Sequence, residues 1–391
     1  MSSQAPDRAI ISYGPHASGG WHLRPVSVRP LREKEVLVEM VASGICQTDL
    51  HFAGIESGAG VHYPRVMGHE GSGYVRALGP NTSTTAKPGD PVILSFSACQ
   101  DCETCADGHP AYCSRFNDIN FNADDANRVF RDTTVPSTSP AETHPVYGQF
   151  FGQSSFASLS IVHEDSIINV AGCVKTRDEL RLLAPLGCGV QTGAGTILNA
   201  ASATAADRVV IMGLGGVGLS AVAGAKIAGC KQIIGLDRFD ERLELARALG
   251  ATHTVNTAAV ADSGQSLADV VREVTGGLGA TVTLDTTGAP ALVREGVRMT
   301  ALKGRVLQVG VTPEEACLEI PIFEFMMTGK LFMGVIEGDV VPREFVPRLV
   351  KWVQEGVLPL EKLVRYYPAE EFETAVKDMK SGRTVKPVLV W

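Results

Sequence analysis

The sequence predicts an α/β protein of two domains, one mainly β and one built around a doubly wound parallel sheet. Three observations lead to this prediction. The chain has 391 residues, more than one hydrophobic core usually supports. Short apolar runs separated by turns fill its N-terminal half, and from about residue 190 strand and helix patterns alternate. A glycine-rich segment, GLGGVG at 213–218, stands between an apolar run and a helix pattern.

The N-terminal half is predicted to be mainly β and rich in loops. Residues 35–42, EVLVEMVA, alternate apolar and polar side chains as a half-buried strand does. Residues 73–78 and 91–96 are two further short runs, separated by turn residues such as Pro-Gly-Asp. Residues 117–145 are rich in Asn, Asp, Thr, Ser and Pro, and they predict an exposed loop.

The C-terminal half alternates strand and helix patterns. Short apolar runs predict strands at 209–212, 232–236, 281–285 and 305–309. An amphipathic helix is predicted over 240–249, ended by Gly250, and the tail predicts helices over 344–355 and 370–381 before a last strand. This alternation is typical of a parallel sheet with helices on its faces.

The composition argues against several classes of function. The net charge is −8, and no basic stripe suited to nucleic acid or polybasic run suited to a membrane surface is present in the sequence. The longest apolar run, 209–225, contains several glycines, so a buried strand and helix explain it better than a membrane span. The first ten residues lack the apolar core of a secretory signal, and nine cysteines then fit a reducing compartment. We therefore expect a cytoplasmic protein with no nucleic-acid or membrane partner.

Four cysteines lie close together in the stretch CQDCETCADGHPAYC. Their spacing lets four thiolates surround one ion tetrahedrally, and Zn²⁺ is the usual occupant of such a site. Because all four positions are taken by protein, a site of this kind stabilises a loop but performs no chemistry. Disulfides are the alternative, disfavoured without a secretory signal. The sequence thus predicts a structural zinc site at Cys99, Cys102, Cys105 and Cys113.

The segment 213–218 fits the pattern G-x-G-x-x-G and stands where a dinucleotide-binding turn stands. Gly213 permits a tight turn, Gly215 and Gly216 let backbone N–H groups approach a pyrophosphate, and Gly218 lets the helix pack closely on the sheet. The N-terminus of the following helix offers partial positive charge to the phosphates. The alternative is an ordinary strand–turn–helix unit without a ligand.

The second strand of this half ends at Asp237, 19 residues past Gly218. A carboxylate there can accept hydrogen bonds from the ribose hydroxyls and repels a 2′-phosphate, which favours NAD over NADP. Arg238 follows directly and could weaken that preference.

Three further segments carry residues that ligate metals: GICQTDLH at 44–51, GHEG at 68–71 and GCG at 187–189. A single Cys or His of this kind is more often a packed core residue. Together, however, one histidine and two cysteines make a three-ligand zinc site with a fourth position left for substrate.

In this combination the motifs resemble the zinc-dependent medium-chain alcohol dehydrogenases, and the resemblance covers nearly the whole chain. It implies that Cys46, His69 and Cys188 bind a catalytic zinc, with Glu70 beside the metal as an occasional ligand. It also implies that Asp49 hydrogen-bonds the His69 ring. The four-cysteine site corresponds to the family's structural zinc lobe, so two Zn²⁺ per chain are expected.

The resemblance implies the domain layout as well. A GroES-like catalytic domain would comprise residues 1–189 and 335–391, and a Rossmann dinucleotide-binding domain residues 190–334. The strand near 305–311 and the segment to about 330 would help to form a homodimer, with a homotetramer as the alternative.

The activity implied is reversible hydride transfer between a primary alcohol or its aldehyde and NAD(H). A bound zinc lowers the pKa of an alcohol toward neutrality, and Thr48 and His51 would pass the released proton to solvent. The cofactor contacts carried over by resemblance are Thr192, Val217, Asp237, Arg242 and Lys386. Gln47 stands where relatives often have a basic residue, so we expect weaker coenzyme binding.

Substrate size is predicted from two positions. Ser95 stands where several ethanol-active relatives carry a bulky aromatic side chain, and the run FFGQSSFA at 150–157 resembles the aryl- and benzyl-alcohol dehydrogenases. Aromatic or allylic primary alcohols are therefore expected. The alternatives are a glutathione-adduct (formaldehyde) dehydrogenase, a zinc-independent enone or quinone reductase of the same fold, and a binding module that uses the cysteine cluster as a finger.

Overall fold

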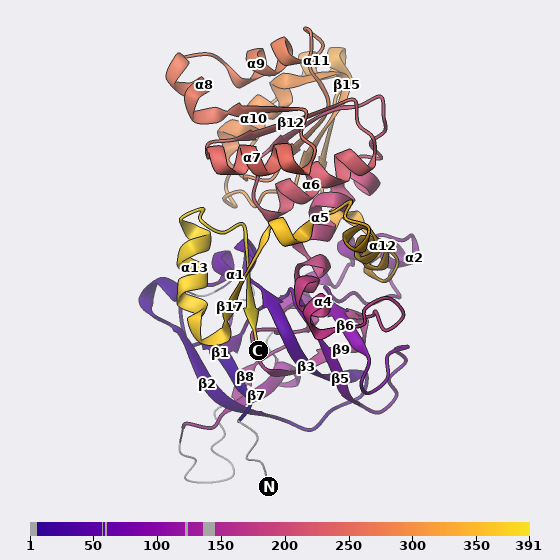
Figure 1. Ribbon diagram of the computed structural model, residues 1–391, viewed down its shortest axis with the longest axis vertical. Coiled ribbons are helices and arrows are strands. Elements are labelled where there is room, and N and C mark those ends of the chain that lie inside the picture. The colour runs from indigo at the N-terminus through magenta and orange to yellow at the C-terminus, as the bar shows by residue number, and fades with distance from the viewer. Residues whose placement is uncertain (1–5, 57, 59–60, 122–123, 136–144) are drawn as a thin grey trace. The chain divides into compact units, whose positions relative to one another are not determined.

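The computed structural model describes residues 6–56, 58, 61–121, 124–135 and 145–391 (Figure 1). The chain divides into two compact units. The first comprises Met1–Cys188, Val341–Lys351 and Leu363–Trp391, and the second Gly189–Val340 and Trp352–Lys362. Each unit is described by itself.

The first unit is mainly β, as predicted, and contains a closed barrel and a seven-stranded sheet. The barrel strands, in spatial order, are β1 (Arg8–Ser12), β2 (Trp21–Val28), β7 (Arg128–Asp132), β8 (Pro145–Tyr147) and β4 (Arg65–Val66). The sheet strands are β10 (Ile167–Asn169), β6 (Pro91–Leu94), β5 (Gly71–Leu78), β3 (Glu35–Gly44), β18 (Lys386–Val390) and β17 (Val364–Pro368), with β9 (Leu159–His163) paired to β3.

Strand β3 lies at the centre of that sheet. Its side chains alternate between buried and half-exposed, as the sequence predicts. Val36, Val38 and Met40 are fully buried, and the residues between them are half-exposed. The strand pairs antiparallel with β5, with β9 and, near its end, with β18. The C-terminal strand of the chain therefore completes a sheet that begins near residue 35.

Short helices connect the strands of the first unit. They are α1 (Gln47–Phe52), α2 (Glu103–Ala106), α3 (Phe116–Phe121), α4 (Arg177–Leu182) and α13 (Phe372–Lys380), and α12 (Pro342–Gln354) runs on from this unit into the second. The long α12 and α13 confirm the two helices predicted in the tail.

The exposed loop predicted over 117–145 is wrong in part. Helix α3 and strand β7 occupy much of it, and residues 122–123 and 136–144 lie outside the described part of the chain. Within β7, Val129 and Phe130 are buried and the strand pairs with β2. Burial of these two side chains in the barrel decides the local structure there, although polar residues dominate the segment's composition.

The second unit is a parallel six-stranded sheet. Its order is β13 (His253–Asn256), β12 (Gln232–Asp237), β11 (Arg208–Met212), β14 (Ala280–Asp285), β15 (Thr300–Gln308) and β16 (Leu331–Gly334). Numbered from β11, this is the order 3-2-1-4-5-6 of a doubly wound dinucleotide-binding fold. The predicted fold class is thus confirmed: a mainly β unit with a cysteine lobe, and a doubly wound parallel sheet.

Helices flank this sheet and connect its strands (Figure 1). The helices are α5 (Gly189–Gly195), α6 (Gly216–Ile227), α7 (Asp240–Leu249), α8 (Thr257–Ser263), α9 (Leu267–Val274), α10 (Pro290–Met299) and α11 (Ile322–Thr328). Helix α6 packs with α7, and α9 packs with α10. Gly250 ends α7 in the left-handed conformation, as its sequence position predicts.

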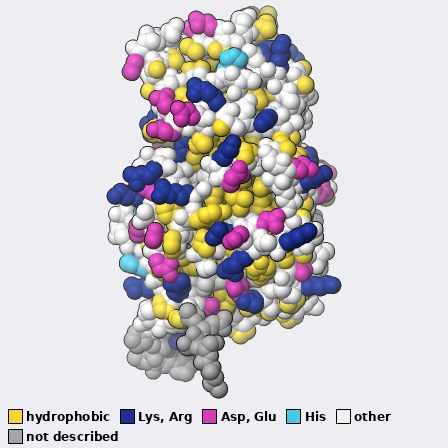
Figure 2. Space-filling model, in the orientation of Figure 1, with side chains coloured by type: hydrophobic (Ala, Val, Ile, Leu, Met, Phe, Trp, Pro, Cys, Tyr) yellow, Lys and Arg dark blue, Asp and Glu magenta, His cyan; other side chains and the backbone are white. Residues whose placement is uncertain are grey.

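Charged groups of both signs are mixed on the face shown in Figure 2, where Lys and Arg lie among Asp and Glu. That face presents no basic stripe of the kind that binds nucleic acid. Among the described residues, no helix is both long and apolar enough to cross a bilayer.

Candidate active site

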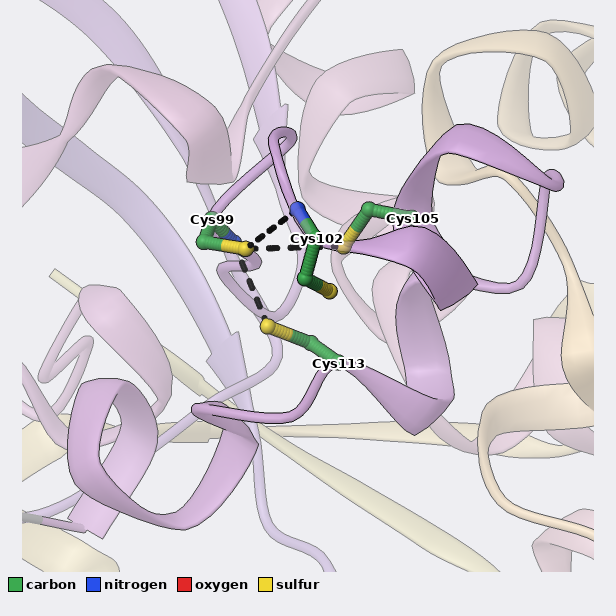
Figure 3. A group of neighbouring side chains, drawn as sticks. All are labelled: Cys99, Cys102, Cys105 and Cys113. Atoms are coloured by element: carbon green, nitrogen blue, oxygen red, sulfur yellow. Dashed lines mark hydrogen bonds between the residues drawn. The ribbon is translucent and has the colours of Figure 1, made fainter.

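The four clustered cysteines converge on one point of the first unit (Figure 3). Their sulfur atoms all lie within 4.8 Å of one another. Backbone N–H groups point at these sulfurs: Cys102 N lies 3.3 Å from Cys99 Sγ, and Arg115 N lies 3.4 Å from Cys113 Sγ. The Thr104 hydroxyl and neighbouring backbone N–H groups lower the pKa of the Cys102 thiol to about 5. Burial raises the pKa of the Cys105 and Cys113 thiols, so among these three the donors favour the thiolate, the form that binds zinc, at Cys102.

A second cluster joins Cys46, His69 and Cys188, all buried in the first unit, and their ligand atoms also lie within 4.8 Å of one another. Cys46 precedes the first turn of α1, His69 lies between β4 and β5, and Cys188 follows a short 3₁₀ turn ending at Gly187. The three ligands thus come from separate stretches of chain that the fold brings together.

Asp49 links two of these stretches. It is fully buried, and its Oδ2 accepts a hydrogen bond from Cys46 N at 2.9 Å. Its Oδ1 accepts from Gly68 N at 3.1 Å and lies 3.0 Å from His69 Nδ1. An ionised carboxylate has no proton to give, so the ring must donate from Nδ1, which leaves Nε2 with its lone pair directed at the cluster. The contact expected between Asp49 and His69 is therefore present.

The charges around the cluster suit a divalent cation. A hydrogen bond from Cys188, together with the charges of Lys386 and His69, holds the pKa of Cys46 well below its ordinary value. Although burial alone would lower it, Asp49 and Cys46 hold the pKa of His69 above its usual range. The first shift reflects hydrogen bonding and positive charge that favour the thiolate of Cys46, and the second reflects the negative charge of Asp49 and Cys46 around His69.

Glu70 and Lys386 form a buried ion pair beside the cluster, with 2.7 Å between Lys386 Nζ and Glu70 Oε1. Burial raises the pKa of Glu70 to about 7, against the opposing charge of Lys386. Lys386 Nζ also donates to Ile45 O at 3.2 Å. Lys386, which the resemblance implies as a cofactor contact, has its ammonium hydrogen-bonded to these two residues.

The residues present fit a zinc ion. His69 Nε2 is buried and has no hydrogen-bond partner among the described residues, as expected of a nitrogen reserved for a metal. Two sulfurs and one imidazole are the donor set of a catalytic zinc site, which leaves a fourth coordination position for substrate.

Helix α1 carries the residues expected to handle the proton. Thr48 is half-buried, with its Oγ1 3.8 Å from Cys46 Sγ, and His51 is exposed one turn later. Residues three apart lie on the same face of a helix. Gln47, at the start of the helix, is exposed.

In the second unit the glycine-rich segment forms the turn between β11 and α6, and its glycines differ in what surrounds them. Gly213 has a positive φ of +85°, and a Cβ there would lie 2.7 Å from Thr286. A Cβ on Gly218 would lie 1.9 Å from Gly213 O, so only glycine fits that close approach. Gly215 is exposed with open space at its Cβ position. Two glycines are thus required by the turn itself, and the open space at Gly215 leaves room for a phosphate group at the start of α6.

Asp237 ends β12 beside this turn, as predicted. Its Oδ2 accepts from Leu214 N at 2.7 Å and its Oδ1 from Phe239 N at 3.0 Å. Arg238 is exposed and lies over the Phe239 ring. Arg242 is buried in α7, and this burial lowers its pKa.

Of the remaining expected cofactor contacts, Val217 lies half-buried in the first turn of α6. Thr192 is buried in α5, with its Oγ1 3.3 Å from Glu337 Oε2. Gln191 Nε2 donates to the same carboxylate oxygen at 2.9 Å. Glu337, a buried acid that the sequence did not single out, is a charged partner for these two side chains.

Gln153 is another residue whose place the sequence did not indicate. It belongs to the run 150–157. The resemblance of this run to the aryl- and benzyl-alcohol dehydrogenases indicated a substrate class but no role for Gln153. The only sequence feature that could have indicated a role is a polar side chain placed between Gly152 and the small residue Ser154.

Comparison with known proteins agrees with this geometry. The family model for the alcohol dehydrogenase GroES-like domain matches residues 32–171, and that for zinc-binding dehydrogenase matches residues 216–355. The chain is 35% identical over 372 residues to the geraniol dehydrogenase of Castellaniella defragrans, covering 94% of this chain and 95% of that protein.

Two solved structures are similar over almost their full length. An alcohol dehydrogenase zinc-binding domain protein from Burkholderia ambifaria is 37% identical, with a TM-score of 0.89 and 98% of each chain covered. The benzyl alcohol dehydrogenase of Acinetobacter calcoaceticus is 36% identical, with a TM-score of 0.87, covering 98% of this chain and 99% of the other.

Proposed function

The chain belongs to the zinc-containing medium-chain alcohol dehydrogenases, and from this premise we propose that it transfers hydride reversibly between an aromatic or allylic primary alcohol and NAD. Membership of this family establishes the chain as a zinc-dependent alcohol dehydrogenase. The convergence of Cys46, His69 and Cys188 is the observation that carries the proposal of where the chemistry takes place.

Cys46, His69 and Cys188 would hold the zinc, which would supply Lewis-acid chemistry that lowers the pKa of an alcohol, and a nicotinamide would supply the hydride acceptor. The protein's part is to hold the ligands and to remove the proton. Asp49 fixes the tautomer of His69 so that Nε2 faces the metal. Thr48 accepts the proton of the alcohol and passes it along α1 toward His51, which is exposed to solvent.

We propose NAD as the cofactor and place it at the turn between β11 and α6. The start of α6 binds the pyrophosphate, and Asp237 disfavours a 2′-phosphate by charge. Contacts from Gln47, Thr192, Val217, Arg238, Arg242 and Lys386 to the cofactor are part of the same proposal.

An aromatic or allylic substrate is supported by two kinds of observation. Relatives at about 35% identity are named for geraniol, an allylic alcohol, and for benzyl alcohol. The second observation is the run FFGQSSFA at 150–157, which resembles the aryl- and benzyl-alcohol dehydrogenases.

The test is a panel of benzyl alcohol, geraniol and ethanol with NAD and NADP, combined with zinc analysis of the purified protein. We expect kcat/KM to be highest for the first two alcohols with NAD, and two zinc ions per chain. A higher kcat/KM for ethanol than for benzyl alcohol would refute the substrate assignment. A requirement for added glutathione would favour the formaldehyde-adduct enzyme, and absence of zinc would favour an enone reductase.

We also propose that the chain forms a homodimer through the second unit, with a homotetramer as the alternative. Helix α11 exposes a row of large apolar side chains, among them Ile322 at 87% and Phe323 at 73% exposure. Strand β16, the edge of the six-stranded sheet, exposes Leu331. An edge strand beside an apolar face suits a second copy, which would extend the sheet and cover that face. The domain bounds 1–189 with 335–391 and 190–334, and the cytoplasmic location, also remain proposals.

A further inference from the structure

We propose that Ser95 and Gln153 are positioning residues, which join the His69 segment to the Cys188 segment and so hold two zinc ligands at a fixed separation. The inference rests on the proposed role of the Cys46, His69 and Cys188 cluster as the catalytic zinc site. Asp49 already joins the Cys46 and His69 segments. A second link is needed to fix Cys188.

Gln153 clamps the backbone around His69. Its side chain is fully buried, and its Nε2 donates to His69 O at 2.9 Å and to Ser95 O at 3.2 Å. Its Oε1 accepts from Gly71 N at 3.1 Å. One amide group thus binds the main chain before and after Glu70 and also the residue that follows β6. Its NH₂ group is the donor and its oxygen is the acceptor.

Ser95 continues the link to the third ligand. It is 1% exposed, and its Oγ donates to Gly187 O at 2.7 Å, one residue before Cys188. The backbone there is in direct contact, because a Cβ on Gly187 would lie 1.8 Å from Leu94 O. The chain of contacts therefore runs from His69 through Gln153 and Ser95 to the peptide that carries Cys188.

The segment that carries Gln153 is held in an unusual conformation. Gln149, Phe151 and Ser154 all have positive φ values, between 52° and 57°. Such backbone persists only where its surroundings fix it, and it concentrates at functional sites. Here Ser160 Oγ donates to Gln153 O at 2.7 Å, and the Phe151 ring stacks on the His69 imidazole. The strained segment thus presents both an amide and a ring to the same metal ligand.

From the sequence, we expected the small side chain of Ser95 to leave space for a larger substrate. This link gives Ser95 a different role. Its hydroxyl donates to Gly187 O, so the small side chain helps to hold the segment that carries a metal ligand. Groups that orient ligands in this way typically change metal affinity or activity by 10- to 100-fold when removed.

The experiment measures zinc release to a chelator from Ser95→Ala and Gln153→Met proteins. Methionine keeps the volume of glutamine and removes its hydrogen bonds. The structural four-cysteine zinc is an internal reference within each molecule. Ser72→Ala is the matched control, because Ser72 is equally buried and its Oγ donates at 2.9 Å to Leu180 O, a carbonyl that is not in a peptide next to a ligand. The absorption spectrum of cobalt-substituted protein reports ligand geometry directly.

We expect the catalytic zinc of both variants to leave about 10- to 100-fold faster, with an altered cobalt spectrum. The reference zinc and the Ser72→Ala control should be unchanged. Normal release and a normal cobalt spectrum in a folded Ser95→Ala protein overturn the inference, whether or not Gln153→Met folds. A wild-type protein that holds only one zinc overturns it together with the proposed function, whereas two zinc ions with unchanged release in the variants overturn the inference alone.

Discussion

Replacing Asp49 by asparagine should weaken zinc binding at the catalytic cluster while leaving the fold intact. The buried carboxylate faces three N–H groups, those of Cys46, Gly68 and the His69 ring, at 2.9, 3.1 and 3.0 Å. An amide has only one acceptor oxygen. If that oxygen faces Gly68 and His69, the new NH₂ group faces the Cys46 N–H, donor against donor. If the amide turns over, two contacts are lost instead of one.

The size of the expected loss in zinc affinity follows from the one hydrogen bond that Asp49→Asn must lose. A hydrogen bond to a charged group contributes about 1.5–3 kcal/mol net. Since 1.4 kcal/mol is a factor of ten, Asp49→Asn should weaken zinc affinity by about 10- to 150-fold. We expect kcat/KM for benzyl alcohol to fall by a similar factor at limiting zinc, because a smaller fraction of the enzyme then holds its catalytic zinc.

The assay is zinc affinity by competition with a chelator, read beside thermal unfolding. Asp132→Asn is the matched control, because Asp132 is also buried in the first unit and accepts hydrogen bonds from Thr134 N and Oγ1 at 2.8 and 2.6 Å. Loss of stability without loss of zinc is expected there. If Asp49→Asn binds catalytic zinc as tightly as the wild type, the reasoning about its three contacts is refuted.

Three further predictions concern the proton, the cofactor and self-association. Thr48→Val should lower kcat for alcohol oxidation by about 10²- to 10⁴-fold while Thr48→Ser retains most of it; equal rates would remove the hydroxyl from the proton path. Asp237→Asn keeps an acceptor for Leu214 N but loses the one for Phe239 N and the charge, so kcat/KM with NADP relative to NAD should rise at least about tenfold; an unchanged ratio would contradict the proposed repulsion. Phe323→Asp should convert the dimer to a monomer in light scattering with little change in unfolding temperature, because the side chain lies outside the core; a monomeric wild type would contradict the proposed interface.

Local motifs allowed much of the fold and site to be predicted. The four cysteines fall within 15 residues, and their spacing alone indicated a metal site. The turn at 213–218 is likewise local, and Asp237 follows within one strand–helix–strand unit. Such features are determined by neighbours in the sequence, so a single chain is enough to find them.

Contacts between distant residues were beyond this reasoning. Lys386 and Glu70 are 316 residues apart, and nothing near either position indicates that they form a buried ion pair. The joining of His69 to Cys188 through Gln153 and Ser95 has the same character. The short strands of the barrel, such as β4 with two residues, carry too little alternation to be recognised, since their burial depends on partners elsewhere in the chain.

The return of the chain to its first sheet bears on how the protein is made. Strand β18 and Lys386 come from the last six residues, yet they pair with β3 and with Glu70. During synthesis the strands of the six-stranded sheet are translated before this strand, and the sheet that contains β3 gains β18 only afterwards. Until Lys386 has been made, the acid at position 70 lacks that lysine. The first sheet is thus completed by a strand that is translated after all three ligands of the catalytic cluster.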